Sequence, residues 1–182
     1  MRSRGKFPFK CNRCGSEHLT TDNHHSIREE KLVKITFDLS NDGGPVRTES
    51  LWAEPLGKGL CRLRNVPFFA YGFSDRDIVN VVESDGQLWV KSVGERGGHS
   101  TYRIYLPDES TEEKFTRIWI PFEQLGCTYE RANRVLVAID VPPTSDVDAV
   151  YAVLEKGEES GVWTFEEGHC GHPLRPDSQN PD

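Results

Sequence analysis

The chain has 182 residues, of which 36 % are hydrophobic and 28 % are charged, and its formal net charge is −7 at pH 7. This composition excludes a largely disordered chain, no apolar run reaches the roughly 18–20 residues that span a bilayer, and the basic start lacks the apolar stretch of a secretory signal. The net charge is +3 over residues 1–31, −1 over 32–98 and −9 over 99–182, and the acidic second half argues against nucleic acid as its partner.

Residues 1–31 are polar and aperiodic, which predicts an extension without a core of its own. In residues 32–98, short runs of alternating apolar and polar residues are separated by turns such as Asp85-Gly86. The predicted strands cover residues 33–39, 46–54, 61–64, 78–83 and 88–93. Five strands in about 60 residues predict a small antiparallel β-barrel-like domain.

The spacing of apolar residues changes in residues 99–173, where helical spacing occurs as well as alternation. Strands are predicted at 100–106, 127–130, 135–141 and 162–165, the third of them central because it is almost wholly apolar. One helix follows the Ser110-x-x-Glu113 capping box and ends at Gly126, and Pro121 inside it should kink the helix or split it. A second helix opens at Ser145-x-x-Asp148 and ends at Gly157. The order β-α-β-β-α-β predicts a ferredoxin-like sandwich in an α+β protein, followed by a disordered tail at 174–182.

The segments LWAEPLG, NVPFFAYG and ERGGHSTYRI, together with later pieces such as AIDVP and GVWTFEE, resemble a bacterial family known as domain of unknown function 4265. The resemblance covers roughly residues 32–167. It implies a bacterial cytoplasmic protein, and the family has no assigned activity, cofactor or catalytic residue to carry over. The chain departs from the family pattern in its cysteine-bearing N-terminal extension and in the Trp-Ile-Pro run at 119–121.

Five cysteines, an odd number with two in one C-x-x-C pattern, do not form a disulfide framework, so we expect a reducing cytoplasm. Cys11 and Cys14, followed by glycine, suit one half of a structural zinc site. The other two ligands would come either from the nearby His18, His24 or His25, or from Cys170 and His172 at the far end of the chain. The second option is favoured because it explains ligand-type residues at both termini. The alternative is a pair of free thiols.

A second candidate is a small-ligand site around Arg96, His99, Ser100 and Tyr71. The Gly-Gly turn at 97–98 can present N–H groups to an anion, with polar side chains around it. His99 and Ser100 are neighbours in an extended segment and point to opposite faces, which disfavours a nucleophile–base pair. The alternative is a bulged connection in which His99 hydrogen-bonds the second domain.

The sequence contains no phosphate-binding loop, dinucleotide fingerprint, zinc-protease helix or serine-hydrolase elbow. We therefore predict a non-enzymatic protein-binding module of the immunity or antitoxin type, whose acidic second half binds a basic protein. One alternative is an enzyme or small-ligand binder with its site at the seam of the two domains. Another is a nucleic-acid-associated regulator that uses the basic residues 1–31.

Overall fold

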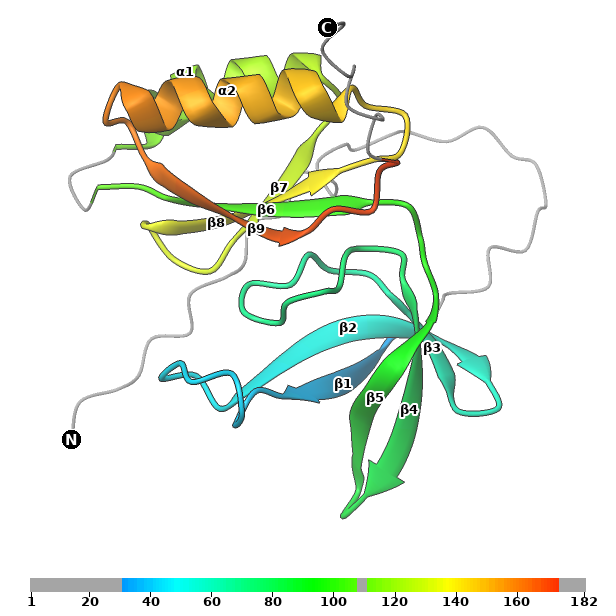
Figure 1. The fold of residues 1–182 in the computed structure, drawn as a ribbon. Helices are drawn as coiled ribbons and strands as arrows, with labels where there is room; N and C mark the ends of the chain where they lie inside the picture. Colours follow the sequence, from blue (N-terminus) through cyan, green and yellow to red (C-terminus); the bar gives the residue numbers. More distant parts are fainter. Residues whose placement is uncertain (1–30, 108–110, 174–182) are drawn as a thin grey trace, which may run out of the picture.

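The computed structural model describes residues 31–107 and 111–173, so the predicted tail and all of the predicted extension except Lys31 lie outside it. The described strands form two separate sheets, and two helices cover one face of the second (Figure 1). This confirms an α+β fold of mainly antiparallel strands. Neither helix in the described ranges is long and apolar enough to cross a membrane.

The first sheet is a closed ring of five strands. They are β1 (Val33–Asp38), β2 (Thr48–Gly57), β3 (Leu60–Leu63), β4 (Ile78–Ser84) and β5 (Gln87–Glu95). Neighbouring strands are antiparallel, except that a parallel contact between β1 and β5 closes the ring. The inward-facing apolar residues, Ile35 and Phe37 among them, fill its interior. The predicted Asp85-Gly86 hairpin is confirmed, and both residues have the positive φ, 53° and 74°, that its tight turn requires.

The second sheet has the strand order β7-β8-β6-β9, and every neighbouring pair is antiparallel. Its elements are β6 (Ser100–Tyr105), α1 (Glu112–Gln124), β7 (Thr128–Arg131), β8 (Leu136–Val141), α2 (Val147–Glu159) and β9 (Thr164–His169). Both helices lie on one face of the sheet (Figure 1), where Phe122 and Leu154 pack on Ile104 and Ile139. The predicted central strand is confirmed, since β8 lies between β7 and β6 and all its residues are buried.

The ends of α1 follow the sequence signals closely. Its N-cap is Thr111, whose side chain accepts a hydrogen bond from the Lys114 N–H at 3.2 Å, whereas the predicted Ser110 lies outside the described residues. The helix ends before Gly126, as predicted, and this glycine has a φ of +80°. Pro121 does not split the helix, which continues through it to Gln124.

The ends of α2 differ from the prediction. Asp146 caps the helix instead of Ser145, because its carboxylate accepts hydrogen bonds from the N–H groups of Asp148 and Ala149. The prediction that Gly157 ends the helix is wrong, since α2 continues to Glu159. Gly157 is buried beneath the indole of Trp163, and a Cβ there would overlap that ring. This glycine therefore serves close packing and not helix termination.

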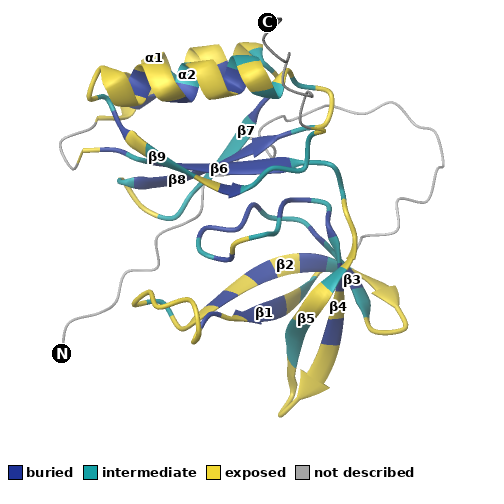
Figure 2. Cartoon of the chain, in the orientation of Figure 1, coloured by how far each residue is buried: buried dark blue, intermediate teal, exposed yellow. Residues whose placement is uncertain are grey.

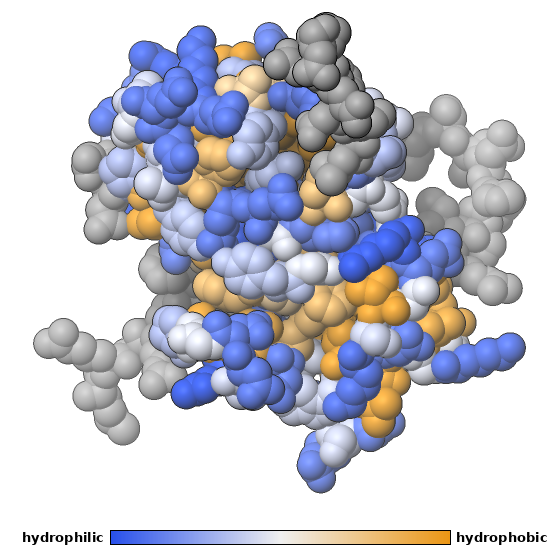
Figure 3. Space-filling view, viewed as in Figure 1, coloured by the Kyte–Doolittle hydropathy of each residue, from blue (hydrophilic) through white to orange (hydrophobic). Residues whose placement is uncertain are grey.

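A long connection, residues 64–77, leaves the ring after β3 and returns to it at β4. We call it the seam loop, because it runs between the ring and the helix-free face of the second sheet (Figure 1). Tyr71 is exposed, whereas the rest of the seam loop is buried or half-buried (Figure 2). Val66 and Phe68 pack with Leu136 and Ala138 of β8. Apolar surface extends across the middle of the molecule at this level (Figure 3).

Candidate functional site

Glu49 of β2 holds the seam loop from the side of the ring. Its buried carboxylate accepts hydrogen bonds from three consecutive backbone N–H groups, those of Phe68, Phe69 and Ala70, at 2.6, 3.0 and 2.8 Å. Consecutive N–H groups that point at one anion form a nest, which compensates the cost of burying the charge. The conformation of the loop is therefore coupled to the position of β2.

Arg103 of β6 holds the same loop from the side of the second sheet. Its side chain is fully buried, and its guanidinium donates to the carbonyl oxygens of Pro67 and Ala70 at 3.2 and 2.6 Å. It also donates to Glu166 Oε1 at 2.8 Å, and it lies over the ring of Tyr71, with 4.5 Å between Cζ and the ring centroid. One cation thus joins β6, β9 and the seam loop.

Glu166 is the centre of a small charged network. Burial acts to raise its pKa, but hydrogen bonds from Arg103, Tyr71 and Tyr105 outweigh burial and hold the pKa below its ordinary value. Burial, together with the negative charge of Glu166, raises the pKa of Tyr105 to about 12. The carboxylate therefore stays ionised and the tyrosine protonated around neutral pH.

A row of polar side chains crosses the helix-free face of the second sheet. Asp140, Thr101 and His169 are cross-strand neighbours on β8, β6 and β9, and so they lie on one face. The Thr101 hydroxyl donates to Ser74 Oγ at 2.9 Å, which links the row to the seam loop. Burial lowers the pKa of His169, and the positive charge of Arg96 lowers it further.

Three ligand-type side chains from separate elements meet beside this row. Asp75 lies in the seam loop, His99 in the linker from β5 to β6, and Asp140 in β8, and one ligand-type atom of each lies within 4.8 Å of the other two. His99 Nδ1 is 2.7 Å from Asp140 Oδ1, and Thr128 donates to Asp140 Oδ2 at 3.3 Å. Both aspartates are buried and His99 is half-buried. Two carboxylates and an imidazole are donors that bind divalent metal ions.

The four residues predicted to bind a ligand all lie around the seam, but each has a different partner. Tyr71 donates to Glu166, Arg96 donates to Asp77, His99 bonds to Asp140, and Ser100 bonds to His172. The alternative prediction for His99 is a hydrogen bond to the second domain, and its bond to Asp140 of the second sheet agrees with that alternative. A site made of these four residues stays a prediction.

The C-terminal half of the predicted zinc site is compact. Cys170 Sγ and His172 Nδ1 lie 3.7 and 2.7 Å from the Ser100 hydroxyl. His172 Nε2 is 3.0 Å from the Pro142 carbonyl oxygen, so Nε2 carries the proton and Nδ1 accepts from Ser100. The N-terminal C-x-x-C and the three nearby histidines lie outside the described residues, and the zinc hypothesis stays untested.

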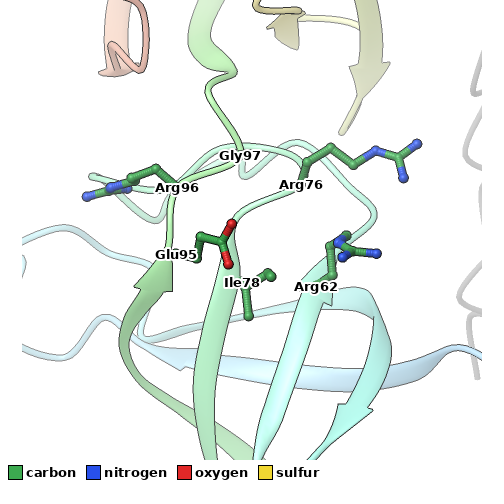
Figure 4. Close-up of a pocket in the computed structure, with 6 residues that line it drawn as sticks. All are labelled: Arg62, Arg76, Ile78, Glu95, Arg96 and Gly97. Carbon is green, nitrogen blue, oxygen red and sulfur yellow. The ribbon is translucent and has the colours of Figure 1, made fainter.

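A cavity of about 310 Å³ lies at the end of the ring, beside the linker to β6 (Figure 4). It is lined by Arg62, Arg76, Ile78, Glu95, Arg96 and Gly97. The guanidinium groups of Arg76 and Arg96 point to opposite sides in Figure 4, and Arg62 pairs with Glu54 at 3.0 Å. These arginines do not converge on one point, so the cavity does not have the geometry of a shared anion site.

A larger groove of about 490 Å³ lies between β2, the seam loop and the β7–β8 hairpin. Trp52, which is 44 % exposed, and Phe69 supply apolar lining. The two carboxylates of the groove, those of Glu49 and Glu130, accept hydrogen bonds from the seam loop. The groove therefore offers a concave apolar surface.

Sequence reasoning did not single out Glu49, Arg103 or Asp140, although each carries a detectable signal. Glu49 alternates in phase with the inward-facing Leu51 and Ala53. Asp140 interrupts the predicted central strand at 135–141, and Arg103 lies within the predicted strand at 100–106. A charged residue at a buried position needs a partner, so these positions indicate buried networks. The identity of the partners depends on the tertiary fold.

Comparisons with known proteins identify the family of the chain and indicate no function. No curated protein matches the chain. Among solved structures, a hypothetical protein from Neisseria gonorrhoeae is similar in fold, with a TM-score of 0.67 and 18 % sequence identity, over 83 % of this chain and 100 % of that chain. The family model described as "Domain of unknown function (DUF4265)" matches residues 49–165. The chain therefore belongs to the DUF4265 family, as its sequence motifs predict.

Proposed function

We propose that this protein is a non-enzymatic protein-binding module that recognises a basic partner through the exposed side of α2. The observation that carries the proposal is the charge on that side. One side of α2 packs into the core through Val150 and Leu154, while acidic residues and a single lysine face solvent. The exposed charged residues of the helix and its N-cap are Asp146, Asp148, Lys156, Glu155, Glu158 and Glu159.

This acidic face has the features of a recognition surface. Tyr151 is 41 % exposed and lies among the acidic residues, and exposed tyrosines are enriched among residues that anchor interfaces. A surface of one charge sign attracts an oppositely charged partner and raises the association rate at low salt. An immunity or antitoxin protein that blocks a basic toxin would use such a surface.

The arrangement of the seam supports binding over catalysis. The side chains that sequence reasoning assigned to a ligand are each engaged in hydrogen bonds within the protein. Catalysis requires a nucleophile or base within reach of a substrate position, and the Ser100 hydroxyl is fully buried.

The test compares two charge reversals of equal size. Glu155→Lys with Glu159→Lys changes the acidic side of α2, whereas Asp42→Lys with Glu83→Lys makes the same net change at exposed positions on the ring. A partner is first captured at low salt from the native host. Its association rate with the α2 variant should then fall roughly tenfold or more, while the ring variant keeps the wild-type rate. Failure to capture a stoichiometric partner, or equal rates for both variants, would overturn the proposal.

A second candidate is a small-ligand binder, favoured by the groove beside Trp52. Concave apolar sites with a few polar groups are typical ligand sites. A fragment screen by NMR should then show hits that perturb the Trp52 indole resonance and are lost in Trp52→Ala. Hits that cluster elsewhere would remove this candidate.

We interpret the closed ring, residues 32–98, as a small β-barrel domain, and residues 99–173 as a ferredoxin-like domain. The strand order β7-β8-β6-β9 and the two helices on one face support the second assignment, because they follow the plan of a split βαβ sandwich.

A further inference from the structure

We infer that Asp75, His99 and Asp140 form a binding site for one divalent metal ion, with Zn²⁺ or Mn²⁺ as the ion. The three residues come from the seam loop, the linker between the sheets and β8. The site is separate from the zinc ligands that the sequence suggests, and it does not depend on the proposed partner surface.

The three side chains lie close enough to share one metal ion. One ligand-type atom of each residue lies within 4.8 Å of those of the other two. A metal ion bonds to carboxylate oxygen and imidazole nitrogen at roughly 2.0–2.2 Å, so the donors of one ion lie roughly 3–4 Å apart. His99 Nδ1 and Asp140 Oδ1 are joined by a hydrogen bond of 2.7 Å, so a metal ion would replace this hydrogen bond and the two atoms would move apart to hold the ion between them and Asp75.

The charges of the two buried carboxylates also favour a bound cation. Asp75 and Asp140 are 1 % and 0 % exposed, and two carboxylates so near each other in a buried setting repel strongly. Asp75 forms an ion pair with Arg76, whose Nε lies 3.5 Å from Asp75 Oδ2, and a directly bound cation would bring a positive charge closer to this carboxylate. A divalent cation between the three side chains would neutralise both carboxylates at once.

The types of donor atom in the site indicate which metal ion it would bind. Imidazole suits zinc and other first-row metals, whereas Mg²⁺ and Ca²⁺ prefer oxygen alone. The hydroxyl of Thr128 donates to Asp140 Oδ2, which is the type of outer contact that orients a ligating carboxylate. Because the imidazole must be neutral to bind, protons compete with the metal and affinity falls in acid.

The structural consequence is a cross-link between the two sheets. The ion would fix the seam loop and the linker to β8, so its binding free energy would add to the stability of the fold. His99 is only half-buried, which leaves a path for the ion.

The first experiment uses the full chain with Cys11→Ser and Cys14→Ser, so that the N-terminal thiols cannot bind the metal. After treatment with a chelator, Zn²⁺ and Mn²⁺ are titrated by calorimetry, with Mg²⁺ for comparison. We expect one ion per chain, and a rise in unfolding temperature of roughly 5–10 °C at a hundredfold excess over Kd. If neither Zn²⁺ nor Mn²⁺ binds, the inference is overturned.

The second experiment locates the ion. His99→Gln should weaken binding at least tenfold, whereas His172→Gln, which changes a histidine of the predicted zinc site, should leave it unchanged. Equal affinity in both variants would also overturn the inference. If the variants do not fold, Mn²⁺ added to the unsubstituted chain should broaden the NMR signals of residues 75, 99 and 140 first. Broadening centred on any other residues would count against the site.

Discussion

Replacing Arg103 by alanine should strongly destabilise the protein. The change would leave the buried carbonyl oxygens of Pro67 and Ala70 without their donor, would remove the cation beside Glu166, and would open a cavity in the seam. Leaving two buried carbonyl oxygens unsatisfied and removing the buried cation of a pair whose Glu166 is 31 % exposed together cost about 3–5 kcal/mol. For a chain of this length that corresponds to a fall of about 6–20 °C in unfolding temperature.

Urea denaturation of wild type and variant measures this loss, and Arg117→Ala is the matched control. Arg117 pairs with Glu113 at 2.6 Å, a shorter distance than any Arg103–Glu166 contact, but its side chain is 75 % exposed. Exposed pairs on a helix contribute only about 0.3–0.5 kcal/mol, so the control should unfold almost as wild type does. Arg103→Lys should fall between the two, because the single ammonium nitrogen of lysine cannot reach all three acceptors that Nε, Nη1 and Nη2 of Arg103 reach from separate positions. A loss below about 1 kcal/mol in Arg103→Ala would refute the role of burial argued here.

Three further predictions concern stability. Glu49→Gln should lower the free energy of unfolding by roughly 1–3 kcal/mol in urea, because its amide nitrogen would face an N–H donor of residues 68–70; a neutral change would contradict the nest. Gly157→Ala should cost roughly 1–3 kcal/mol in the same assay despite the better helix propensity of alanine, since its Cβ would overlap Trp163; a gain in stability would speak against that contact. Burial raises the pKa of the Cys127 thiol from 9.0 to about 12, so the thiol loses its proton at lower pH in the unfolded chain than in the folded one. The stability of the protein should therefore fall as the pH rises between these values. Cys127→Ala should make this fall less steep in thermal unfolding, and an identical slope would exclude the thiol as a cause.

Local patterns predicted most of the strands and both helices. Alternation marks β1, because one face of that strand contacts the interior of the ring and the other does not. The Asp85-Gly86 turn is equally local, since it depends on the backbone freedom of two adjacent residues. Such features require no knowledge of what lies across the molecule.

The candidate site depends on contacts between distant parts of the chain. Asp75 and Asp140 are far apart in sequence, and they meet only because the seam loop leaves the ring and lies on the helix-free face of the sheet. The prediction for Gly157 is wrong for the same reason. A glycine near a helix end usually indicates that the helix ends there, but this one leaves space for the ring of Trp163. In both cases the deciding neighbour is supplied by tertiary packing.

The way the ring closes has a consequence for its internal motion. β1 and β5 meet through only two residue pairs, Ile35↔Leu88 and Thr36↔Trp89, whereas the ladder from β1 to β2 runs along the whole of β1. We therefore expect the short parallel ladder between β1 and β5 to open more readily than the long antiparallel ladder between β1 and β2. Transient opening between β1 and β5 would let water reach the apolar interior of the ring without disturbing the helices. In hydrogen exchange, the backbone amides beside this short ladder should then exchange before those of β8.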